Sequence, residues 1–220
     1  MVLLLSNIFV CVCALFSLVF GIICFWKPRK GLYAKMAVLG IGCIVFGRLF
    51  QIVRLLTGGE ILGAFQLGLF GTVGSLMFFF SSNFGIMDSL ADDGAARYKK
   101  YRLIALAAPL AALAIYVIFT LCTSASLLWK IIAAVLTVFI MQTAYFNLKH
   151  LIFPDVDYGV IDSLKFYNGL VLAYSLLCSA ELAAMSAGAK TAYAIISALM
   201  GICMLLIAPM LSRGVKQWTT

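Results

Sequence analysis

Arg48 and Glu181, two residues of opposite charge, each lie inside a long apolar segment and are the side chains best suited to chemistry. Arg48 is in segment 32–57 and Glu181 is in segment 165–187. Each lies a few residues from the centre of its segment, toward the same side of the membrane, so at about 1.5 Å per residue their depths differ by only a few ångströms. A lone charge near mid-bilayer costs about 2.5–3.5 kcal/mol on insertion scales. We therefore expect both side chains to face protein or water, and preferably each other.

A charge pair at this depth has two interpretations. It is either a structural clamp between two parts of the bundle, or a site for a charged ligand or a coupling proton that is open to the outside. The second interpretation predicts further polar side chains at similar or shallower depth. The candidate ligand-binding residues are Arg48, Gln51, Gln66, Tyr116, Lys130, Tyr174 and Glu181.

Three of these residues, Tyr174, Glu181 and Lys130, also belong to other patterns. Tyr167, Tyr174 and Glu181 are spaced by seven residues, which places them on one face of a helix. Trp129 and Lys130 lie near enough to the end of their segment to serve as interface anchors.

The residue content does not favour catalysis or a metal site. The chain has one His, no Ser or Cys nucleophile spaced with a His and an acid, and no paired carboxylates inside its apolar segments. The seven Cys residues contain no C-x-x-C motif, so small apolar packing is their expected role. We predict no enzymatic activity, no cofactor and no metal.

The elements that position these side chains are seven apolar segments with short polar connections. Each has about 20 residues or more, enough to cross a hydrocarbon core of about 30 Å. With 65% apolar residues and a mean hydropathy of +1.12, the chain is far more apolar than a soluble domain. We predict an all-α integral membrane protein, a seven-transmembrane-helix bundle with segments 2–26, 32–57, 61–87, 103–122, 126–147, 165–187 and 190–211.

Within these segments, small residues and prolines predict local packing. Small residues recur at four-residue spacing, as in Gly68-Thr72 and Gly71-Ser75, which allows helix backbones to approach closely. Pro109 and Pro209 are predicted kinks.

Basic residues predict the orientation. By the positive-inside rule, the side that carries most of them is cytoplasmic, so the N-terminus is outside and the C-terminus is cytoplasmic in a plasma or inner membrane. This distribution explains the net charge of +8 without a nucleic-acid partner, and it makes membrane lipids the first expected partner. Twelve of the 16 Lys and Arg residues lie on alternate connections and the tail: Lys27, Arg29, Lys30, Lys35, Arg97, Lys99, Lys100, Arg102, Lys149, Lys165, Arg213 and Lys216.

The segment spacing also indicates a duplication. Residues 1–87 form a candidate first repeat of three helices, 88–124 a cytoplasmic loop with a linker helix, and 125–220 a candidate second repeat with the tail. This is a parallel 3+1+3 arrangement within one domain of residues 1–220, and such transporters bind substrate near mid-membrane. The alternative is seven helices with coincidental spacing.

Three functions are compatible with these patterns. The first is a small transporter or permease-like protein for an anionic or zwitterionic small molecule bound near Arg48. The second is a receptor or sensor that signals through a separate cytoplasmic protein partner. The third is a non-catalytic subunit of a larger complex, and homo-oligomers are compatible with all three.

Overall fold

The computed structural model is an all-α bundle, and it describes the whole chain except residues 28–30, 85–87, 89–91, 93, 155–159 and 220. Within the described residues, six helical stretches are long and apolar enough to cross a membrane. Five are the continuous helices α1 (Val2–Phe25), α2 (Leu32–Leu56), α7 (Leu127–Ile152), α8 (Val160–Ser186) and α9 (Lys190–Thr219). The sixth joins η1 (Ala96–Tyr98), α5 (Lys99–Ala105), α6 (Ala107–Tyr116) and the π-helical turn η2 (Val117–Leu121).

Large apolar side chains cover the outer surface of this bundle as well as its interior. A soluble protein of this size rarely exposes contiguous apolar patches beyond a few hundred Å². The outer surface is therefore that of a helical membrane protein. Exposed examples are Phe16, Ile23, Phe46, Phe70, Leu110, Ile118, Ile131 and Ile195.

The third apolar segment differs from its prediction. A single helix was expected over 61–87, but α3 spans only Gly68–Phe84, and residues 61–67 are not helical. Gly63 has a φ of 66°, a left-handed conformation that cannot continue a helix. The 17 residues of α3 span about 25 Å. Residues 85–87 lie outside the described residues.

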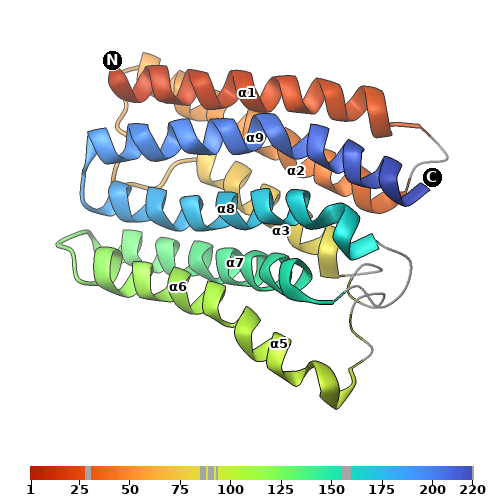
Figure 1. The fold of residues 1–220 in the computed structure, drawn as a ribbon. Coiled ribbons are helices and arrows are strands. Elements are labelled where there is room, and N and C mark those ends of the chain that lie inside the picture. The colour runs from red at the N-terminus through yellow and green to blue at the C-terminus, as the bar shows by residue number, and fades with distance from the viewer. Residues whose placement is uncertain (28–30, 85–87, 89–91, 93, 155–159, 220) are drawn as a thin grey trace.

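The helices run side by side, and their packing follows a closed order (Figure 1). α1 packs on α2 and α9, α2 on α3, α3 on α7, α7 on α8, and α8 on α9, while α6 packs on the outside against α7 and α8. The two termini lie at opposite ends. The end where α1 begins is called the N-terminal end of the bundle, and the end where α9 finishes is called the C-terminal end.

The close contact between α2 and α3 depends on glycine. A Cβ on Gly71 would lie 2.5 Å from the carbonyl oxygen of Cys43 and 2.5 Å from Cα of Gly47. A Cβ on Gly47 would lie 2.7 Å from the carbonyl oxygen of Gly68. The two backbones therefore touch directly, as the small-residue spacing predicted.

Proline shapes the sixth helical stretch. Pro109 has no N–H to donate to the carbonyl of Ala105, and the α-helix is interrupted at Leu106, whose N–H donates to the carbonyl of Leu103 at 3.2 Å. Figure 1 shows α5 leaving the line of α6, so the predicted kink at Pro109 is confirmed. Pro209 lies inside α9, which continues past the predicted residue 211 to Thr219.

Candidate functional site

Arg48 and Glu181 form a bidentate ion pair inside the bundle. Nη1 of Arg48 lies 2.8 Å from Oε1 of Glu181, and Nη2 donates to Oε2 at 2.9 Å. The residues come from α2 and α8, and they are 2% and 5% exposed. The expectation that these two charges turn toward each other is confirmed. One charge-assisted hydrogen bond and one ion-pair contact therefore hold the guanidinium against the carboxylate.

Neutral acceptors surround the rest of the guanidinium. Three neutral acceptors share the two hydrogens of Nη1 of Arg48: Oδ1 of Asn7 at 3.0 Å, Oε1 of Gln51 at 2.9 Å and the hydroxyl of Tyr193 at 2.9 Å. Nη2 lies 3.7 Å from the sulfur of Met200. These contacts compensate the loss of water around a buried charge.

Hydrogen bonds also join the Glu181 carboxylate to a neutral side chain, and two of the neutral side chains to each other. Oε1 of Glu181 accepts from the hydroxyl of Ser197 at 3.1 Å, and the Tyr193 hydroxyl donates to Oδ1 of Asn7 at 3.2 Å. All of these residues are buried. The central polar network is defined as Asn7, Arg48, Gln51, Glu181, Tyr193 and Ser197, and it joins α1, α2, α8 and α9.

Helical spacing places these groups together. Arg48 and Gln51 are three residues apart on α2, and Tyr193 and Ser197 are four residues apart on α9, so each pair shares one face of its helix. Glu181 belongs to the seven-residue series on α8, whose interior position the structure confirms.

The tyrosines of that series bind α3 rather than the ion pair. The Tyr174 hydroxyl lies 2.7 Å from the hydroxyl of Ser75, and the Tyr167 hydroxyl lies 3.2 Å from that of Ser82. Ser75 and Ser82 are themselves seven residues apart. Tyr174 is therefore one step of a hydrogen-bonded ladder between α3 and α8, and no hydrogen bond joins its hydroxyl to Arg48 or Glu181 among the described residues.

The other predicted site residues lie elsewhere. Gln66 is buried, its Nε2 donates to the carbonyl of Ile61 at 3.4 Å, and its Oε1 has no hydrogen-bond partner. The Tyr116 hydroxyl donates to the backbone carbonyl of Lys130 at 3.2 Å, which pairs these two residues at the α6–α7 contact. The structure thus brings Arg48, Gln51 and Glu181 together but leaves Gln66, Tyr116, Lys130 and Tyr174 outside the network.

Trp129 is also placed differently from its prediction as an interface anchor. It is 1% exposed, and its Nε1 donates to the hydroxyl of Ser186 at 2.8 Å. The same Ser186 hydroxyl donates to that of Thr120 at 3.2 Å in η2. The indole therefore helps to join α7, α8 and η2.

The candidate ligand-binding residues did not include Asn7, Tyr193, Ser197 or Met200, which all contact the ion pair. Asn7 is the one amide side chain in the apolar segment 2–26, and a buried amide in a membrane helix needs a partner, so that feature could have identified it. Met200 carries no comparable signal, because methionine is common in apolar helices.

A cavity of about 350 Å³ lies at the N-terminal end of the bundle. It is formed where α1 begins, where α2 ends and where α8 turns into α9. Neither Arg48 nor Glu181 lines this cavity, so the pair is closed off from it in this conformation.

A second charged cluster lies near the C-terminal end of α7. Nζ of Lys149 lies 2.7 Å from Asp88 and 2.8 Å from Asp92, and Nε2 of His150 lies 3.2 Å from Asp88. Burial alone would raise the pKa of Asp88, but hydrogen bonds from His150 and Lys149 outweigh it and hold that pKa below its ordinary value. Nothing among the described residues groups three or more His, Cys, Asp or Glu side chains as a metal site would.

Comparison with known proteins gives no relative: no family model, no curated protein and no solved structure matches the chain. The function must therefore be argued from the site itself.

Proposed function

We propose that this chain is a non-enzymatic, seven-span transporter for a small anionic or zwitterionic molecule in a plasma or inner membrane. The observation that carries the proposal is the bidentate Arg48–Glu181 pair, buried between helices of the first and last thirds of the chain. Buried ionic groups inside membrane helices are costly and commonly mark substrate or ion pathways.

The chemistry of Arg48 suits a carboxylate. Its planar guanidinium presents parallel N–H groups that match the two oxygens of a carboxylate. Glu181 occupies that position in this structure. A substrate carboxylate would take its place, and the displaced Glu181 would then pair with a substrate ammonium or take up a proton.

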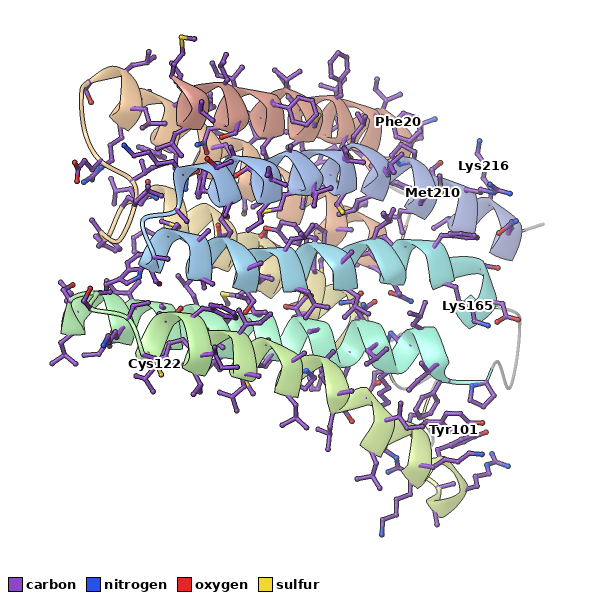
Figure 2. All side chains as sticks on the ribbon, turned by 60° about the vertical axis from the view of Figure 1, so that its left-hand side comes forward. Phe20, Tyr101, Cys122, Lys165, Met210 and Lys216 are labelled. Carbon is purple, nitrogen blue, oxygen red and sulfur yellow. The ribbon has the colours of Figure 1, made fainter. Side chains whose placement is uncertain are left out.

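The seven-span topology includes α3 together with the non-helical residues 61–67. Irregular backbone at membrane depth is tolerated where protein buries it. Ile61 and Gln66 are buried, whereas Phe65 and Leu67 are 45% and 56% exposed, so protein covers this segment on one side. An odd number of crossings accounts for termini at opposite ends of the bundle. Figure 2 shows Lys165 and Lys216 at the C-terminal end, which supports a cytoplasmic C-terminus. Arg29 and Lys30, part of the same prediction, lie outside the described residues.

The packing order supports the proposed duplication. If α1, α2 and α3 correspond to α7, α8 and α9, the contact of α1 with α9 corresponds to that of α7 with α3. The contacts of α1 with α2 and of α2 with α3 have the counterparts α7 with α8 and α8 with α9. The middle helices of the two repeats would then be α2 and α8, which carry Arg48 and Glu181.

Uptake into proteoliposomes tests this function. The purified full chain is reconstituted, and uptake of radiolabelled small carboxylates and amino acids is measured. We expect saturable uptake of at least one compound and a loss of more than tenfold in Arg48→Lys. Lysine keeps the charge but lacks the planar fork, so this variant separates carboxylate recognition from charge.

Tyr174→Phe is the matched control, since it alters a buried polar residue outside the central polar network and should transport normally. Binding without uptake would make the chain a receptor. Co-purification with a partner at fixed stoichiometry, without binding or uptake, would make it a subunit of a larger complex. Uptake that Arg48→Lys leaves unchanged would remove Arg48 from the site.

A further inference from the structure

The cavity at the N-terminal end of the bundle carries both signs of charge beside an apolar wall. Glu60 and Lys190 line it, and Leu3, Leu55, Ile61 and Leu62 form its apolar side. Its volume of about 350 Å³ falls within the range of about 300–1,000 Å³ that is typical of small-molecule sites.

Neither charge is used by the protein itself. Among the described residues, the side chains of Glu60 and Lys190 have no hydrogen-bond or ion-pair partner. The backbone of Glu60 is fixed instead, because its carbonyl accepts from Nε of Arg54 at 2.7 Å. A carboxylate and an ammonium group that line one cavity without partners are therefore both available to a ligand.

The cavity lies on the N-terminal side of the central polar network, along the axis of the bundle. Leu3 precedes Asn7 by four residues, Leu55 follows Gln51 by four, and Lys190 precedes Tyr193 by three. Each of these three lining residues thus lies about one helical turn, or about 4.5–6 Å, farther toward the N-terminal end than the residue of its own helix that contacts Arg48. The carbonyl of Leu3 also accepts from Nδ2 of Asn7 at 2.8 Å, which links the cavity wall to the network.

We infer that this cavity is the first binding site for the substrate, and that the substrate is a zwitterion with an apolar side chain, of the α-amino-acid type. The substrate carboxylate binds Lys190, its ammonium group binds Glu60, and its apolar side chain packs against Leu3, Leu55, Ile61 and Leu62. The carboxylate then moves inward by one turn to Arg48. This inference rests on the proposed function, and it narrows the substrate class of the same pathway.

Equilibrium binding to the full chain in lipid nanodiscs tests the inference with L-leucine as the probe. We expect saturable binding of leucine, and binding at least tenfold weaker for 4-methylpentanoate, which lacks the ammonium group, and for 3-methylbutylamine, which lacks the carboxylate. Glu60→Gln and Lys190→Gln should each weaken leucine binding about tenfold. Glu60→Gln should leave 4-methylpentanoate binding unchanged, and Lys190→Gln should leave 3-methylbutylamine binding unchanged.

Lys165→Gln is the control, because it removes a basic charge at the opposite end of the bundle. If none of the 20 standard amino acids binds, or if leucine binds equally well to both cavity variants, the inference is overturned. The proposed function is judged separately, by uptake and its loss in Arg48→Lys. If carboxylate uptake depends on Arg48 but not on Glu60 or Lys190, the proposed transport function stands and the cavity is not part of the transport pathway.

Discussion

Arg48 and Glu181 lie 133 residues apart in the chain, yet two contacts of 2.8 and 2.9 Å join them in the interior of the bundle. Removal of one partner leaves a buried charge uncompensated, which costs about 3–5 kcal/mol. We expect Glu181→Gln and Arg48→Gln each to destabilise the protein by about this amount. The loss of unfolding free energy in the double variant should be smaller, by at least about 2 kcal/mol, than the summed losses of the two single variants. Unfolding of the detergent-solubilised protein by SDS titration measures this coupling; additive effects would contradict it.

The ladder between α3 and α8 gives a second prediction. Tyr174→Phe removes the hydrogen bond to Ser75 and should cost about 0.6 kcal/mol, the average for such bonds between membrane helices, and at most about 1.7 kcal/mol. Ser75→Ala should cost a similar amount, and the double variant should cost little more than either single one, because all three remove the same bond. The same unfolding titration measures these differences. A double variant with the summed loss would show that the two hydroxyls act independently.

The glycines at the α2–α3 contact give a third prediction. Gly71→Ala places a Cβ against the backbone of Cys43 and Gly47, so the helices must separate, at a cost of about 1–3 kcal/mol. Gly42→Ala is the matched control, a glycine of α2 that faces α1 instead of α3. Its Cβ would meet only Leu18, at 3.6 Å, so this change should be neutral or slightly stabilising. Melting temperatures of the two variants decide the matter, and equal values would argue against direct backbone contact.

Asp88 gives a prediction about acid stability. Its pKa is lowered in the folded protein, so the folded state binds this proton less tightly than the unfolded state does. The resulting stabilisation is present above the unfolded-state pKa of about 3.9, and it is lost as the pH falls through the folded-state pKa. Asp88→Asn should therefore lower the melting temperature at pH 7 and reduce its decline at acid pH.

Melting temperatures at pH 7 and between about pH 5 and 3 measure this effect. Asp162→Asn is the control, because the Asp162 side chain is 60% exposed and should contribute little to the acid decline. An Asp88→Asn variant with the wild-type profile would show that the Lys149–His150 cluster does not act through this carboxylate.

Much of the fold could be predicted from hydropathy, because six apolar segments became helices of membrane-spanning length. The Arg48–Glu181 pair was predictable for an energetic reason: two charges in apolar segments have few alternatives to each other. The non-helical segment before Gly68 could not be predicted, because the sequence remains apolar through residues 61–67. Only the left-handed φ of Gly63 shows where a helix cannot continue.

The remaining site residues were less predictable, because helices that are apolar on all sides do not reveal which face turns inward. Tyr116 and Lys130 lie at a plausible depth, yet the Tyr116 hydroxyl binds the backbone carbonyl of Lys130 at the α6–α7 contact instead of the ion pair. Asn7 sits near the chain start, and only the contact of α1 with α2 and α9 brings it to Arg48.

The glycine contact between α2 and α3 also limits how the bundle can open. Two backbones that touch without intervening side chains leave nothing to repack between them, so this contact has no rotamer freedom. The facing helix α9 instead presents Met200 and Met204, both fully buried, and flexible thioether side chains can repack as a neighbour shifts. Of the surfaces around Arg48, the one that faces α9 is therefore better able to repack than the one between α2 and α3.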